Sequence, residues 1–181
     1  RYLETNLKDI YAIGDCAEQH EGIGHRKPIE AVWYTGRMMG ETVAQTICGN
    51  KTKYNPGHWF NSAKFLDIEY QTYGWVFSER NKKDYEEHFH WRDTKENICI
   101  TIAFHKETKE FLGINTFGIR MRHEIFDHWL TEAKTIFYVL EFLKDANFDP
   151  EFYKKYESEI VTQFNITFGT TIKPQKRSWK R

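Results

Sequence analysis

The sequence lacks long hydrophobic runs and paired cysteines. No apolar stretch in its 181 residues approaches the ~20 residues that a membrane-spanning helix needs. Its cysteines, Cys16, Cys48 and Cys99, are odd in number and widely spaced, and no CxxC or Cys/His zinc pattern occurs. This excludes a disulfide framework and favours a reducing, cytoplasmic location. The chain opens without an initiator Met or a cationic and apolar leader, so we expect neither a secretory signal nor a membrane partner.

The sequence also lacks an excess of charge of either sign, because 26 Lys and Arg balance 26 Asp and Glu. The balance is uneven along the chain: the last nine residues, KPQKRSWKR, hold five basic residues and no acidic one. A nucleic-acid groove needs its basic residues on the folded body. We therefore expect no nucleic-acid partner, and a mobile basic tail over residues 169–181.

The chain has what a folded core requires. Hydrophobic residues make up 40% of it and aromatic residues 17%, which excludes collagen-like and low-complexity classes. At this length it forms one domain or two small ones.

The first 50 residues carry a strand–loop–helix pattern. A short apolar run, Asp9–Ile13, ends at Gly14 and predicts a buried strand. Apolar positions then recur at helical spacing from Ile29 to Cys48, with Pro28 suited to a first helical turn and Gly49 to the residue after a helix. The polar connector that follows, 51–57, is the predicted domain boundary.

Beyond the connector the pattern changes to strands and then helices. Four β-type runs joined by short polar linkers predict an antiparallel meander: Phe65–Phe77, His88–Arg92, Ile98–His105 and Phe111–Ile119. Two amphipathic helices should follow, one spanning Phe126–Leu143 and one with Asp149 as N-cap, Pro150 at its first position, and a stripe of Phe152, Tyr156, Ile160 and Phe164. The predicted fold class is α+β, with domains over residues 1–50 and 54–168.

The residues that carry chemistry lie after the first predicted strand. Gly14 lets a ligand approach the backbone, and Asp15 can accept hydrogen bonds from sugar-like hydroxyl groups. The helix expected to begin near Pro28–Glu30 would aim its N–H groups and the positive end of its dipole at the same crevice. The pattern predicts a site for a hydroxylated, partly anionic ligand.

The segment TNLKDIYAIGDCAE, with Thr5 and Asp15 in place, resembles the second flavin-binding signature of FAD-dependent pyridine nucleotide oxidoreductases, the flavoproteins with two dinucleotide-binding domains. The segment HRKPIEAVWYTGRMMGETVAQTICG resembles the helix that follows in that family. The resemblance implies that residues 1–50 are the C-terminal remnant of a Rossmann-like FAD-binding domain. It also implies that residues 54–168 are the interface domain, which commonly mediates homodimers.

The resemblance also implies roles for individual residues. Gly14 and Asp15 would meet the ribityl chain of FAD, and Glu30, Ala31 and Val32 would lie by the pyrimidine edge of the flavin. An aromatic pair near the ring is typical of the branches with ferredoxin-reductase or apoptosis-inducing-factor character, and Trp59 and Phe60 are its counterparts here. NAD(P)H would be the substrate of the parent protein.

The two GxGxxG loops that bind FAD and NAD(P)H in this family do not occur in the chain. Gly22-Ile23-Gly24 follows a loop and lacks the third glycine. The chain is therefore expected to be a C-terminal fragment that is catalytically inactive and binds FAD poorly or not at all on its own. Its partners would be the remaining FAD and NAD domains of its parent. We assign no catalytic and no metal-binding residue to it.

Two alternatives remain open at the level of the sequence. The chain could be a non-enzymatic interaction module in which Gly14-Asp15 is a simple strand exit. His88 and His90 share one face of a strand, and with His105 they could bind a metal, although partly exposed sheet histidines are commoner.

Overall fold

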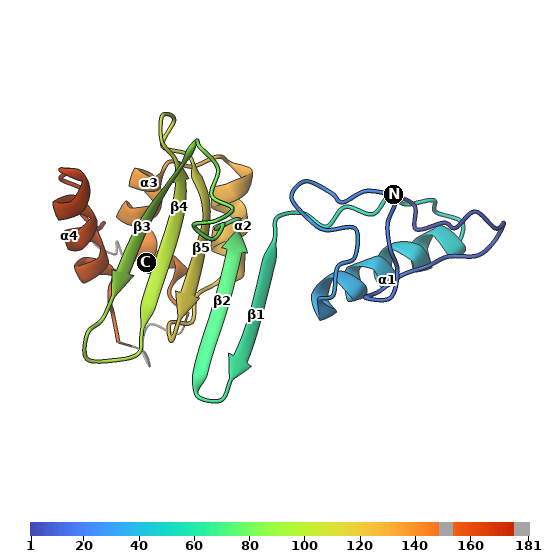
Figure 1. Cartoon of the computed structure of the whole chain (residues 1–181), viewed down its shortest axis with the longest axis horizontal. Helices are drawn as coiled ribbons and strands as arrows, with labels where there is room; N and C mark the ends of the chain where they lie inside the picture. The colour runs from blue at the N-terminus through green and yellow to red at the C-terminus, as the bar shows by residue number, and fades with distance from the viewer. Residues whose placement is uncertain (149–153, 176–181) are drawn as a thin grey trace, which may run out of the picture. The chain divides into compact units, whose positions relative to one another are not determined.

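The computed structural model describes residues 1–148 and 154–175. The chain divides into two compact units, Arg1–Gly57 and His58–Arg181, and the predicted connector 51–57 lies at the end of the first (Figure 1). The predicted N-cap Asp149 with Pro150 and Phe152, and the basic residues Lys176, Arg177, Lys180 and Arg181, lie outside the described residues.

The first unit is built on one helix, α1 (Trp33–Ile47). Its small core contains Leu3, Met39, Val43 and Tyr54. Gly49 follows the helix with a positive φ of 93°, as expected for the residue after a helix end. The helix begins later than predicted, because Val32 is extended (φ −132°, ψ 130°) and serves as its N-cap.

The predicted buried strand over Asp9–Ile13 is wrong. Asp9 has a φ of 61° and Ile10 is exposed, so the segment turns back on itself. Its hydrogen bonds join it to residues 3–5: the Thr5 N–H donates to the Ile10 carbonyl (2.9 Å) and the Ala12 N–H to the Leu3 carbonyl (3.0 Å). The unit has no neighbouring strand for a parallel sheet among its described residues, so local pairing satisfies these groups.

The second unit contains a five-stranded antiparallel sheet of β1 (Phe60–Phe65), β2 (Ile68–Gly74), β3 (Glu86–Arg92), β4 (Cys99–His105) and β5 (Phe111–Phe117). The strand order is β1-β2-β5-β4-β3, so the predicted meander is wrong in its order: β5 pairs with β2. The run predicted as one strand over Phe65–Phe77 instead contributes the end of β1 and all of β2, which form a hairpin.

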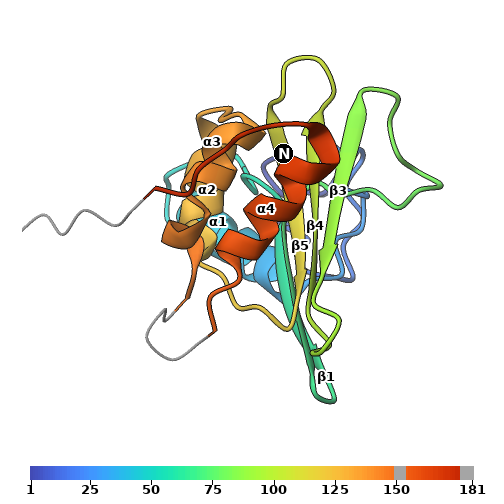
Figure 2. The ribbon, with the colours of Figure 1, turned by 90° about the vertical axis from the view of Figure 1, so that its left-hand side faces the viewer.

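The helices of this unit, α2 (His123–Thr131), α3 (Ile136–Glu141) and α4 (Glu157–Phe168), cover one face of the sheet (Figure 2). The single helix predicted over Phe126–Leu143 is divided into α2, α3 and a 3-10 turn, η1 (Leu143–Ala146). The break has a local cause: Ala133 has a φ of 49°, and the Lys134 carbonyl accepts a hydrogen bond from the Phe111 N–H (2.8 Å). Thr135 then caps α3.

The main core lies between the helices and the sheet. It contains inward-facing residues of β3, β4 and β5 and the apolar stripes of the helices, including Phe89, Ile100, Ile102, Phe104, Ile114, Phe126, Ile160 and Phe164. On the other face, the segment after β2 crosses over β5 at Gly113, where a Cβ would lie 2.6 Å from the backbone nitrogen of Trp75. The α+β class with an antiparallel sheet and helices is confirmed.

Candidate functional site

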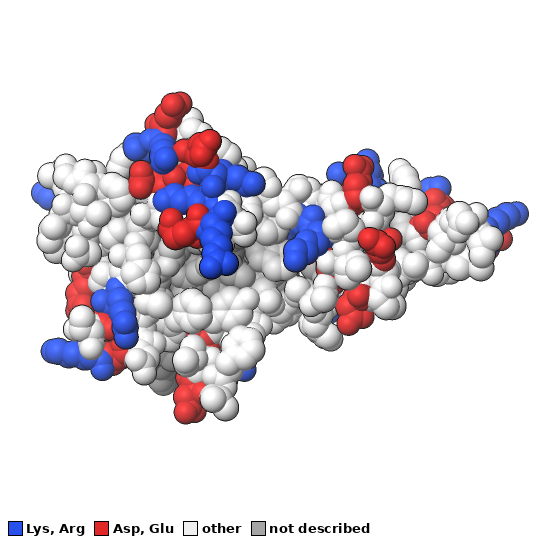
Figure 3. Space-filling view, viewed as in Figure 1, with Lys and Arg blue, Asp and Glu red and all other residues white. Residues whose placement is uncertain are grey.

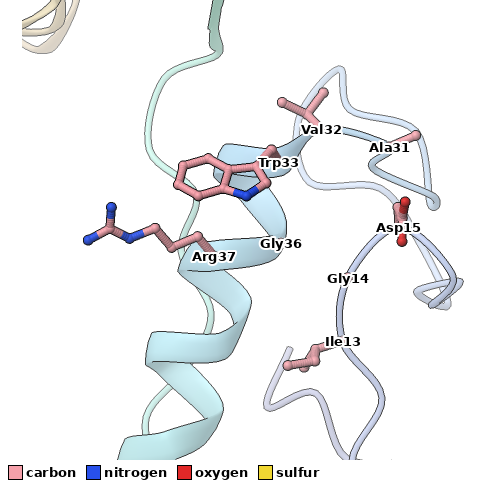
Figure 4. Close-up of a pocket in the computed structure, with 8 residues that line it drawn as sticks. All are labelled: Ile13, Gly14, Asp15, Ala31, Val32, Trp33, Gly36 and Arg37. Carbon is pink, nitrogen blue, oxygen red and sulfur yellow. The ribbon is translucent and has the colours of Figure 1, made fainter.

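The first unit contains a pocket of about 370 Å³ between the turn at Gly14-Asp15 and the start of α1. One side is Ile13–Asp15, and the other is the first turns of the helix (Figure 4). Its lining residues are Ile13, Gly14, Asp15, Ala31, Val32, Trp33, Gly36 and Arg37. Its volume is within the range of small-molecule sites.

Two glycines bring the walls of the pocket together. A Cβ built at Gly36 would lie 3.6 Å from the Gly14 Cα, so the helix and the loop approach almost to backbone contact. Gly14 has a φ of 87°, and its N–H donates to the Met39 Sδ (3.4 Å). The Gly-Asp turn thus packs against α1 at Gly36, and the positive φ of Gly14 is a conformation that favours glycine.

The N-terminus of α1 has no side-chain cap. Val32 makes no side-chain cap, and the first helical hydrogen bond runs from the Gly36 N–H to the Val32 carbonyl (3.1 Å). The N–H groups of the first turn therefore have no acceptor within the helix and lie at the positive end of its dipole. They can donate to a carbonyl or partly anionic atom.

The Asp15 side chain supplies the complementary chemistry. It is exposed, and among the described residues no hydrogen bond or ion pair involves its carboxylate. A carboxylate without a protein donor can accept hydrogen bonds from ligand hydroxyl groups. The pocket thus combines one acceptor group with a set of backbone donors.

The structure brings four of the seven predicted site residues together: Gly14, Asp15, Ala31 and Val32. The Glu30 side chain points elsewhere, and Trp59 and Phe60 belong to the second unit. Besides Ile13, three helical residues of the lining were not predicted as site residues: Trp33, Gly36 and Arg37. A helix start placed at Trp33 would have found them, because positions 33, 36 and 37 share one face of a helix.

Glu30 is buried in an ion pair with Arg26. The two side chains are 2% and 3% exposed, and the Arg26 Nη1 lies 2.6 Å from the Glu30 Oε2. Tyr54 is fully buried in the same unit, and burial together with the Glu30 charge raises its pKa to about 12. Its hydroxyl makes no hydrogen bond within the described part of the chain.

Trp59 and Phe60 differ in their surroundings within the second unit. The Trp59 ring stacks on Trp75, with centroids 5.4 Å apart, and both side chains are half-buried. Phe60 packs against the main core, and its ring lies 4.3 Å from that of His123. The two aromatic side chains therefore have separate environments.

The three histidines of the metal alternative make other contacts. The His90 ring bonds Thr101 (3.0 Å), and the His105 Nδ1 accepts from two backbone N–H groups. His88 lies near the carboxylates of Glu86 and Glu79, at 3.4 and 3.6 Å. Over residues 1–148 and 154–175, no group of three His, Cys, Asp or Glu side chains is arranged to hold a metal ion.

Two surface properties bear on partners. On the face in Figure 3, the blue side chains of Lys and Arg are interspersed with the red ones of Asp and Glu. Such mixed charge is unlike the basic stripe of a nucleic-acid interface. No helix within the described residues combines the length and apolar character needed to cross a bilayer.

Comparison with known proteins gives both sequence and structural relatives. No protein-family profile matches the chain. Over 75 residues it is 37% identical to the ferredoxin reductase subunit of the 5,5'-dehydrodivanillate O-demethylase of Sphingobium sp., covering 40% of this chain and 18% of that protein.

Solved structures match over more of the chain. An NAD-dependent persulfide reductase from A. fulgidus matches with a TM-score of 0.65 and 17% identity, over 93% of this chain and 34% of that one. An FAD-dependent pyridine nucleotide-disulphide oxidoreductase from Desulfovibrio vulgaris matches with a TM-score of 0.57 and 14% identity, over 77% and 36%. The chain thus spans about a third of the length of these structural relatives, and less of the curated one.

These matches confirm the resemblance found from the sequence. In fold the chain corresponds to the C-terminal part of FAD-dependent pyridine nucleotide-disulfide oxidoreductases, and in sequence it is similar over 75 residues to a ferredoxin reductase subunit.

Proposed function

We propose that the chain is the C-terminal part of a longer FAD-dependent NAD(P)H oxidoreductase. The observation that carries the proposal is the pocket in which Gly14-Asp15 faces the uncapped N-terminus of α1. The relatives support it, because they share the fold, and the chain corresponds to only a fraction of their length. Residues 1–50 would complete an FAD-binding domain, and residues 54–168 would be the interface domain.

The residues of the pocket fit a flavin nucleotide. FAD, when bound, supplies the hydride and electron transfer chemistry. Asp15 would accept hydrogen bonds from the ribityl hydroxyl groups, and Gly14 would let that chain pass close to the backbone. The Glu30–Val32 backbone and the first turn of α1 would donate to the pyrimidine edge and favour negative charge there.

Trp59 is proposed as the aromatic side chain that faces the flavin ring in the complete protein. Its stacking on Trp75 holds the indole in one orientation. Phe60, the other residue of the predicted aromatic pair, packs against the main core and His123. In this proposal the chain contributes binding and electrostatics, and none of its residues is catalytic.

The isolated chain should be inactive and should bind FAD weakly, since one carboxylate and one helix end are a small part of a flavin site. We further propose that the complete protein is cytoplasmic and forms a homodimer through residues 54–168. Gel filtration of the chain over a range of concentrations tests the dimer.

The reading frame upstream of Arg1 tests the proposal. It should encode two GxGxxG units, each between a strand and a helix. An open reading frame without them would show that the Gly-Asp turn belongs to a non-enzymatic module. Fluorescence titration of the isolated chain with FAD should give no stoichiometric binding, and tight binding would contradict the fragment interpretation.

A further inference from the structure

The buried Arg26–Glu30 pair stands out in the first unit. Its side chains are 3% and 2% exposed, although the unit has only a small core. Removing two charges from water is costly, and apolar residues of similar size often stabilise a protein as well. A second Arg–Glu pair with the same spacing, Arg37–Glu41, is 64% and 61% exposed and lies on the surface of α1. The burial of the first pair therefore needs a reason beyond stability.

The pair ties together three segments of the first unit. The Gln19 Nε2, from the loop after Asp15, donates to the Glu30 Oε1 (3.2 Å). The Arg26 Nη2 donates to the backbone carbonyls of Pro56 and Gly57 (3.4 and 3.5 Å). The buried pair thus joins the loop that contains Gln19, the segment before α1, and the last two residues of the unit.

The backbone of Glu30 takes part in the hydrogen bonds at the start of α1. With Glu30 held, its carbonyl accepts the Val32 N–H (2.9 Å) and the Thr35 hydroxyl (3.4 Å). The Thr35 hydroxyl also donates to the Val32 carbonyl (2.8 Å). These bonds lie beside the extended Val32, at which the helix begins, and both Val32 and Trp33 line the pocket opposite Asp15.

We infer that Arg26 and Glu30 are positioning residues of the pocket. The Glu30 carboxylate binds Arg26 and Gln19, and the pair holds the Ala31–Val32 backbone and the N-terminus of α1 in the geometry that receives the ligand. The inference rests on the proposed function for the identity of the ligand. The geometry itself can be tested without one.

The first experiment uses the 181-residue chain without flavin. Glu30→Gln removes the carboxylate that neutralises the buried Arg26 charge, so amide hydrogen exchange at Val32 and Gly36 should accelerate roughly tenfold or more. Exchange at Val43 and in β4 should be unchanged. Glu41→Gln, the matched change in the exposed pair, should alter exchange less than about twofold. A uniform acceleration through the first unit, or none at Val32, would overturn the inference.

The double variant Arg26→Met/Glu30→Met tests whether the pair positions the backbone at the start of α1 or only stabilises the first unit. Two buried apolar side chains of similar size should return the melting temperature close to that of the original chain. The amide chemical shifts of Val32 and Gly36 should stay displaced, because nothing then holds the Glu30 backbone. Recovery of both the melting temperature and the shifts would show that the pair is merely structural.

A second experiment uses the complete protein encoded by the reading frame. Glu30→Gln should retain bound flavin but change its reduction potential and visible spectrum. Glu4→Gln, which breaks the exposed Lys51–Glu4 pair of the same unit, should change neither. An unchanged potential in Glu30→Gln would contradict the positioning role. A complete protein that carries no flavin would refute the proposed function, while the exchange measurements would still decide the role of the pair.

Discussion

Replacing Phe126 with alanine should strongly destabilise the second unit. The side chain is fully buried on α2, at the centre of the contact between the helices and the sheet. Its ring stacks on Tyr73 (5.0 Å between centroids) and meets the rings of Trp129 (5.3 Å) and Phe111 (5.9 Å). The substitution would remove all three contacts and leave a cavity.

The magnitude follows from this environment. A buried Phe→Ala change costs about 3–5 kcal/mol through lost burial and the cavity. The aromatic pairs place Phe126 toward the upper end of that range. Since a domain of this size is stable by about 5–15 kcal/mol, the variant should stay folded at low temperature but melt about 12–20 °C lower.

Phe117→Ala is the matched control. Phe117 lies on β5 of the same sheet but is 39% exposed and packs on Tyr70 (5.7 Å between centroids). Its removal should cost about 1 kcal/mol or less. Urea unfolding followed by circular dichroism measures both variants. Equal losses for the two, or a loss below about 1.5 kcal/mol for Phe126→Ala, would refute the described core.

Three further predictions concern the sheet, a thiol and acid stability. Gly113→Ala should destabilise the second unit by about 1–3 kcal/mol and change tryptophan fluorescence, because a Cβ would overlap the backbone that crosses over it. Burial raises the pKa of the Cys99 thiol, so a maleimide should modify the exposed Cys16 and Cys48 before Cys99, as mass spectrometry can follow; equal rates at all three would contradict this. Hydrogen bonds from Tyr156 and Lys154 hold the pKa of Glu96 below its usual value, so its contribution to stability is present at neutral pH and lost as acid protonates it. Glu96→Gln should therefore lower the melting temperature at neutral pH, with a difference that disappears in acid; a difference independent of pH would contradict the assignment.

Much of the fold could be predicted because its signals are local. The runs at His88–Arg92 and Ile98–His105 alternate along their length and are separated by a short polar linker, and both are strands in a hairpin. Strand β1 was missed in large part, since it includes the half-buried Asn61 and the exposed Ser62 and Lys64, which carry no strand signal. The pairing of β2 with β5 depends on contacts far apart in the sequence, which no local pattern reveals.

The candidate site could also be predicted only where its residues are adjacent in the sequence. Gly14 and Asp15 follow from a motif of adjacent residues, and they do line the pocket. The orientation of Glu30 could not be predicted, because it depends on the turn that returns Arg26 to it and on the carbonyls of residues 56 and 57. The strand predicted over Asp9–Ile13 was wrong because an apolar run forms a strand only where a neighbouring strand can pair with it.

The most direct test of the central proposal is the flavin content of the complete protein encoded by the reading frame. Flavin released on denaturation should amount to about one per polypeptide, should fall sharply in Asp15→Asn, and should be unchanged in Asp67→Asn, a control at the turn between β1 and β2. A complete protein without flavin, or one in which Asp15→Asn binds flavin as well as the control does, would contradict the proposed flavin site.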